Sequence, residues 1–101
     1  MAQKTETHSA TEAQRQTLTP PLFTVIMLND DYTSMEFVIE TLEKIFRKPP
    51  PEATRIMLNI HQQGEGVCGH YPFEIAETKV ALVHERAEVA GFPLRCRIDA
   101  A

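Results

Sequence analysis

A run of hydrogen-bond acceptors, Asn29-Asp30-Asp31-Tyr32-Thr33, lies between an apolar segment and an amphipathic one. Acceptors gathered in this way attract a cation or a group of hydrogen-bond donors. Asn and Asp also fill ordinary turns because they bond to their own backbone, and carboxylates are favoured at helix N-termini. Two interpretations therefore stay open, a binding site for a cation or donor group and plain turn chemistry.

His61 is the second candidate, because a neutral imidazole accepts a hydrogen bond and a protonated one does not. It follows Met57 by four residues, which places both side chains on one surface of a helix. A histidine at the edge of the core explains the same position without any function. Met35 and Met57 are ordinary core fillers, although methionine also lines adaptable pockets. His70 and His84 are expected to be exposed.

Enzymatic chemistry has weaker support. Cys68 and Cys96 are far apart and lack paired spacing, so we expect reduced, structural thiols, and no oxyanion-hole motif accompanies Cys68. No glycine-rich phosphate loop occurs, and we expect no cofactor and no bound metal. The alternative of a different class is a small metal-dependent hydrolase that uses Asp30, Asp31 and His61, although these residues lack the spacing of structural metal sites.

Composition places these residues in one soluble domain. The chain has 101 residues, of which 43% are hydrophobic and 24% charged, as in average globular proteins. Its net charge of −4 disfavours nucleic acid as a partner. No apolar run approaches the ~20 residues that a membrane helix needs, which argues against a membrane partner. The N-terminus lacks a basic segment followed by an apolar one, so we predict a cytoplasmic location.

Residues 1–19 are polar and contain Leu18 as their one sizeable aliphatic side chain. Such a segment buries too little apolar surface to offset the entropy of ordering it. We therefore predict a flexible, disordered N-terminal extension over residues 1–19 and a folded domain over residues 20–101.

Hydrophobic periodicity and turn residues predict six elements in the domain. Thr33 and Glu36 have the spacing of a capping box, which predicts a helix start near Ser34. The order is β-α-α-β-α-β, which favours a small α+β fold with a three-stranded antiparallel sheet packed against three helices. The strands are expected at residues 22–28, 67–71 and 94–98, and the helices at residues 34–48, 51–62 and 72–90.

Five blocks of sequence in one order resemble the ClpS family of bacterial protease adaptors. The first block reads LNDDYTSMEFV. The resemblance covers the chain from about Pro20 to its end and implies the same small α/β domain. Family members bind N-degron proteins and peptides, which begin with Phe, Tyr, Trp or Leu, and deliver them to the AAA+ unfoldase ClpA for degradation by ClpP. The resemblance thus implies an N-end rule adaptor with no catalytic residue. The blocks are residues 28–38, 53–64, 67–69, 76–81 and 93–96.

The resemblance also implies roles for individual residues. Asn29 and His61 match residues that hydrogen-bond the substrate's α-amino group, and Asp31 matches an acid that assists through water. Asp30 matches a residue that adds negative charge and contacts the peptide backbone, and Thr33 helps to shape the rim. Matches to the apolar wall that takes the first side chain are Met35, Val38, Met57, Ile60 and Leu94.

In the family, the methionine matched by Met35 is a gate that rejects β-branched first residues. The family's common Thr-Pro-Met reads Thr33-Ser34-Met35 here, which removes a proline that fixes φ at the helix start. A regulatory binder that occupies the unfoldase without delivering substrates is a further possibility. The surface that docks on the unfoldase's N-terminal domain is matched by Glu74, Thr78 and Lys79.

Overall fold

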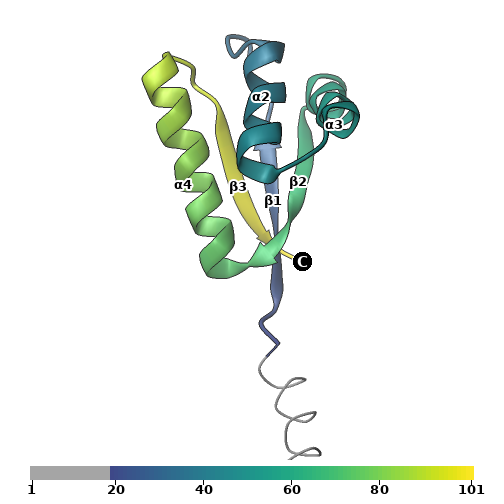
Figure 1. Cartoon of the computed structure of the whole chain (residues 1–101), viewed down its shortest axis with the longest axis vertical. Coiled ribbons are helices and arrows are strands. Elements are labelled where there is room, and N and C mark those ends of the chain that lie inside the picture. Colours follow the sequence, from purple (N-terminus) through teal and green to yellow (C-terminus); the bar gives the residue numbers. More distant parts are fainter. Residues whose placement is uncertain (1–18) are drawn as a thin grey trace, which may run out of the picture.

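The structure is a computed structural model that describes residues 19–101. Apart from Thr19, the predicted flexible extension lies outside the described residues. Three strands and three helices follow one another in the predicted β-α-α-β-α-β order (Figure 1). Within residues 19–101, no helix is both long and apolar enough to cross a membrane. The elements are β1 (Leu22–Leu28), α2 (Met35–Phe46), α3 (Pro50–Gln63), β2 (Glu65–Pro72), α4 (Phe73–Ala90) and β3 (Arg95–Ala100).

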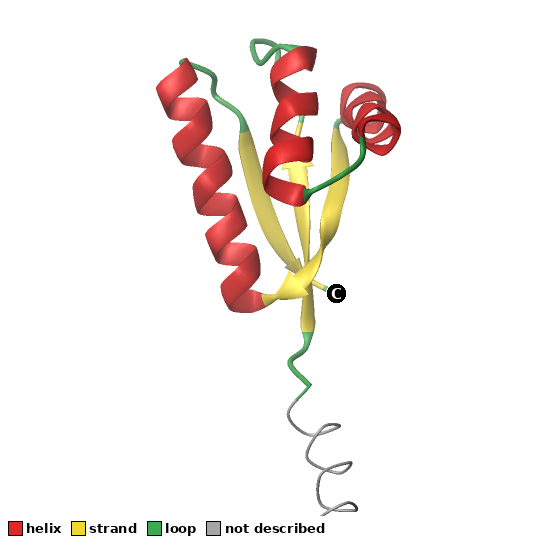
Figure 2. Cartoon of the chain, viewed as in Figure 1, coloured by secondary structure: helices red, strands yellow, loops and turns green. Residues whose placement is uncertain are grey.

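The sheet has the order β2-β1-β3, and both pairings are antiparallel. β1 is therefore the central strand, which fits its largely apolar sequence, and its Val25 and Met27 are fully buried. α3 packs against β2 and α4 packs along β3, while α2 lies between these two helices (Figure 2). The helices and the sheet enclose one hydrophobic core, which also contains Leu42, Val83 and Leu94.

The start of α2 differs from the predicted capping box by one residue. Ser34 is the N-cap, and its hydroxyl oxygen accepts a hydrogen bond from the backbone N–H of Phe37 at 3.1 Å. Thr33 does not cap the helix because its hydroxyl donates to the Asp30 carboxylate at 2.7 Å. Glu36 instead lies in the first turn, where the helix dipole favours a negative charge.

The end of α3 is fixed close to the end of β1. Gly64 ends α3 with a left-handed φ of 90°, and its carbonyl accepts from the backbone N–H of Asn29 at 2.9 Å. Gly66 allows α3 to approach β2 closely, because a Cβ at this position would lie 2.7 Å from the Ile60 side chain. These contacts bring the last turn of α3, which carries His61, beside the segment that begins with Asn29.

The two cysteines are free and buried, on β2 and β3. A hydrogen bond to Cys96 and burial together raise the pKa of the Cys68 thiol. A raised pKa keeps this thiol protonated and unreactive, which fits the predicted structural role.

His84 is half-buried, so the prediction of an exposed side chain was wrong. Its Nε2 accepts a hydrogen bond from the backbone N–H of Cys96 at 3.1 Å. Burial and the nearby Arg95 charge lower the pKa of His84. His70 is exposed as predicted, and its Nδ1 lies 3.0 Å from the Thr24 hydroxyl.

Candidate functional site

A cavity of about 390 Å³ lies between the loop after β1, the first turn of α2 and the C-terminal part of α3. Every predicted substrate-binding residue except Leu94 lines it. Its further lining residues, Tyr32 and Ser34, were missed, although their position within the acceptor-rich loop could have indicated them. The lining consists of Asn29, Asp30, Asp31, Tyr32, Thr33, Ser34, Met35, Val38, Met57, Ile60 and His61.

Leu94 lies in the core and does not line this cavity. It is 2% exposed and precedes β3, so the sheet and helices cover it on all sides. It belongs to the same buried cluster as Val38, Met57 and Ile60. Its place in the structure is therefore that of a core residue beside the apolar wall.

Four of the lining residues are apolar. Val38, Met57 and Ile60 are buried core residues whose side chains also line the cavity. Met35 is 47% exposed and lies at the first position of α2, next to the loop. The apolar wall of the cavity thus consists of three buried side chains from two packed helices and the exposed, flexible and polarizable side chain of Met35.

Asp30 organises the polar loop. Its Oδ1 accepts from the backbone N–H groups of Tyr32 at 2.8 Å and Thr33 at 2.6 Å, and its Oδ2 accepts from the Thr33 hydroxyl. Burial raises the pKa of Asp30, but these hydrogen bonds outweigh burial and bring it below the ordinary value. Asp30 is therefore ionised at neutral pH, and turn chemistry accounts for most of its bonding.

Asn29, Asp31 and His61 differ from Asp30 because their side chains are uncommitted. All three residues are exposed, and they come from the end of β1, the loop and the last turn of α3. Within the described residues, none of these side chains makes a hydrogen bond or ion pair with the protein. Their acceptor atoms are thus available to a molecule that enters the cavity.

The charge of the cavity is negative. Two carboxylates, Asp30 and Asp31, line it, and no lysine or arginine of residues 19–101 does so. The polar side chains of the lining favour a cation that donates several hydrogen bonds. The apolar side chains favour a large hydrophobic group attached to that cation.

The residues proposed for a metal-dependent hydrolase do not form a ligand set. Asp30 and Asp31 follow β1 and His61 lies on α3, and no group of three or more His, Cys, Asp or Glu side chains within residues 19–101 could hold a metal ion. Both oxygens of Asp30 are already occupied by donors of its own loop. The donor set therefore fits turn formation better than metal coordination.

The residues predicted to contact the unfoldase lie on α4 in two different environments. Glu74 and Thr78 are exposed, and the Thr78 hydroxyl donates to the Glu74 carbonyl at 3.0 Å. Lys79 is half-buried, and its Nζ donates to the Ile45 carbonyl of α2 at 2.7 Å and lies 5.0 Å from the centroid of the Tyr71 ring. Lys79 thus links α4 to α2, in addition to any contact with a partner.

Known proteins resemble this chain over nearly the whole domain. The family model "ATP-dependent Clp protease adaptor protein ClpS" matches residues 18–97. A ClpS from Nitratidesulfovibrio vulgaris (strain DSM 19637 / Miyazaki F) is 58% identical over 80 residues, which cover 79% of this chain and 80% of that protein. A ClpS from Maricaulis maris is 53% identical over 90 residues, which cover 89% of this chain and 83% of that protein.

A solved structure supports the same assignment. Agrobacterium tumefaciens ClpS2 bound to L-phenylalaninamide superimposes with a TM-score of 0.78 at 36% identity, over 81% of this chain and 99% of that chain. The matched proteins are named as adaptors and not as enzymes, which leaves the hydrolase alternative without support. The chain belongs to the ClpS family of Clp protease adaptor proteins.

Proposed function

We propose that this adaptor binds proteins that begin with Phe, Tyr, Trp or Leu and delivers them to a ClpA-type unfoldase for degradation by ClpP. The observation that carries the proposal is the cavity itself, whose lining combines uncommitted acceptors with buried apolar side chains. A chain start is the part of a protein in which an ammonium group and a side chain are attached to the same carbon.

The acceptors suit a free α-amino group. An ammonium has three donors and no acceptor, so it leaves water at little cost only where acceptors surround it. Asn29 and His61 are proposed to accept two of its hydrogen bonds, and Asp31 contributes negative charge. Each lost hydrogen bond to a charged group costs about 1.5–3 kcal/mol. A peptide whose α-amino group is blocked, or a residue inside a chain, is therefore a poor ligand.

The apolar wall suits a large first side chain. Burying a Phe or Leu side chain contributes roughly 1.5–3 kcal/mol, which separates large from small first residues by about ten- to a hundredfold. Val38, Met57 and Ile60 supply buried apolar contacts for it, and Met35 adds a partly exposed one. The wall thus selects size, while the acceptors require a free chain start.

The ligand of the A. tumefaciens relative has the proposed chemistry. L-phenylalaninamide carries a free α-amino group and a phenylalanine side chain, and its amide takes the place of the next peptide bond. This chain shares the relative's fold. The likeness supports N-degron binding by the present cavity.

Delivery requires a contact with the Clp unfoldase in addition to the cavity. We propose that Glu74 and Thr78, on the exposed surface of α4, contact the N-terminal domain of a ClpA-type unfoldase, with Lys79 beside them. The cytoplasmic location remains a prediction from the sequence.

A panel of fluorescent peptides that differ in the first residue alone tests the proposal. Anisotropy titrations should give dissociation constants for Phe-first and Leu-first peptides about ten- to a hundredfold below that of the Ala-first peptide. The Ala-first peptide is the control for contacts made by the rest of the sequence. Equal affinity for all three peptides contradicts the proposed function.

A further inference from the structure

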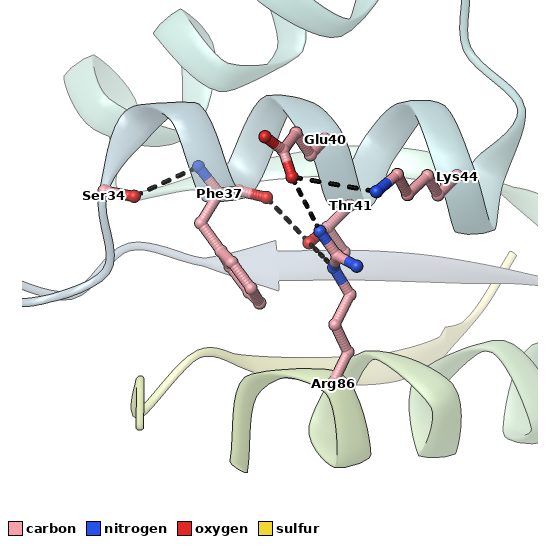
Figure 3. Close-up of polar contacts among 6 residues, drawn as sticks. All are labelled: Ser34, Phe37, Glu40, Thr41, Lys44 and Arg86. Carbon is pink, nitrogen blue, oxygen red and sulfur yellow. Dashed lines mark hydrogen bonds and ion pairs between the residues drawn. The ribbon is translucent and has the colours of Figure 1, made fainter. Parts of the chain in front are cut away.

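Arg86 of α4 joins the two helices α4 and α2 through one group of contacts (Figure 3). Its Nε donates to the Thr41 hydroxyl at 3.2 Å, and its Nη2 lies 3.0 Å from a carboxylate oxygen of Glu40. Its guanidinium lies over the Phe37 ring, 4.7 Å from the ring centroid. Arg86 therefore contacts Phe37, Glu40 and Thr41, which lie on one face of α2.

The contacts with Thr41 are sheltered from water, whereas the Glu40 carboxylate is exposed. Thr41 is completely buried, and its hydroxyl donates to the Phe37 carbonyl at 2.7 Å while it accepts from Arg86. The side chains of Arg86 and Glu40 are 27% and 54% exposed, and those of the surface pair Arg55–Glu52 are 62% and 41% exposed, so the difference lies in the burial of the arginine. A partly buried pair that shares a buried hydroxyl constrains its helices more than an exposed pair does.

Phe37 connects Arg86 to the first turn of α2. Its N–H donates to the Ser34 hydroxyl oxygen, and its ring packs on Phe92 with centroids 4.9 Å apart. The same turn carries Met35 and Val38 into the cavity from another face of the helix. The position of Phe37 thus determines the position of the α2 part of the cavity wall.

Ser34, in place of a proline, makes the contacts of Phe37 more important for the start of α2. A serine leaves φ free at the residue before the helix, so the start of α2 depends on the cap bond and on packing to stay in place. Phe37 provides both, since its N–H completes the cap and its ring lies between Arg86 and Phe92.

We propose that Arg86 is a positioning residue for the cavity. By holding Phe37 and Thr41, it fixes the first turn of α2 and with it Met35 and Val38, and so it sets how strongly β-branched first residues are rejected. This inference rests on the proposed function and adds to it a residue that lies outside the cavity lining.

The test is the ratio of affinities for Leu-first and Ile-first peptides. Arg86→Met keeps an unbranched side chain over Phe37 and removes the hydrogen bonds, and we expect it to lower this ratio about fivefold. Leu and Ile differ in the position of one methyl group, and pockets discriminate a change of one such group by about 10- to 200-fold. Thr41→Val, which removes the shared hydroxyl, should lower the ratio about twofold. Arg86→Lys should restore part of the discrimination. Arg55→Ala, which removes an exposed Arg–Glu pair on α3, should leave the ratio unchanged.

Amide hydrogen exchange gives a second readout that needs no peptide. In Arg86→Met, the amides of Phe37 and Val38 should exchange faster relative to those of Met57 and Ile60 on α3. Equal losses of affinity for Leu-first and Ile-first peptides, with uniform exchange, overturn the inference and leave Arg86 a purely structural residue. If the unmodified chain binds no peptide, both proposals fail. If it binds with a ratio that Arg86→Met does not change, this inference alone fails.

Discussion

Asp31→Lys lowers the affinity for a Phe-first peptide by about a hundredfold or more. The substitution removes an uncommitted carboxylate from the cavity and introduces a cation beside the proposed position of the ammonium group. A charge pair about 4 Å apart interacts by about 1 kcal/mol in water and about 4 kcal/mol near a protein surface, and the substitution both removes the attraction to the ammonium group and adds a repulsion of similar size. Together these terms correspond to about a hundredfold or more in the dissociation constant. Anisotropy titration of the labelled peptide measures this change.

Glu88→Lys is the matched control for this charge reversal. Glu88 is exposed near the end of α4 and does not line the cavity, so its substitution changes the net charge by the same amount. We expect its dissociation constant to stay within about twofold of the unmodified chain, because exposed charges more than a Debye length apart are largely screened. Similar losses in both variants indicate a general charge effect and contradict a role for Asp31 in the cavity.

His61→Ala lowers the affinity for the same peptide by about ten- to a hundredfold. The proposed hydrogen bond from the ammonium group to the imidazole is lost, and about 1.5–3 kcal/mol corresponds to this range. Because the His61 side chain is exposed and bonds to no other described residue, its removal should change the free energy of unfolding by less than about 0.5 kcal/mol. Peptide titration and urea unfolding measure the two effects separately.

His70→Ala is the corresponding control, because His70 is an exposed histidine on β2 outside the lining of the cavity. His61→Gln should recover part of the affinity, since the amide oxygen of Gln also accepts a hydrogen bond. Unchanged binding in His61→Ala removes His61 from the proposed amino-group site, whatever the result for His70→Ala.

The sequence predicted the elements well because their signals are local. The apolar residues of α2 and α3 repeat at helical spacing, and glycines and prolines mark where the helices end. β1 is mostly apolar on both faces, which fits its central place in the sheet, although the order of the strands had no signal in the sequence. The predicted strand 67–71 extends to Glu65–Pro72 in the structure, because both ends continue the pairing with β1.

Details that depend on competing local bonds were harder to predict. Thr33 and Ser34 can each cap a helix, and Asp30 decides between them by taking the Thr33 hydroxyl. The environment of His84 depends on the backbone N–H of Cys96, which β3 brings beside α4. Neither contact has a signal in the spacing of residues along the chain.

Prediction of the candidate site combined two kinds of inference. Residue types alone favoured turn chemistry over ligand binding for the loop at Asn29, and a position at the edge of the core over a binding role for His61. The family resemblance assigned them a common role, and the structure places both in the lining of one cavity. The contacts of Arg86 with Thr41 and Phe37 were not predicted, because they join helices distant in sequence.

The most direct test of the central claim compares a Phe-first peptide with the same peptide acetylated at its α-amino group. Acetylation removes the positive charge and two donors and leaves the phenylalanine side chain unchanged. The account predicts that acetylation raises the dissociation constant by about a hundredfold or more, since at least two hydrogen bonds to a charged group are lost. Equal affinity for the free and acetylated peptides contradicts recognition of a chain start by this cavity.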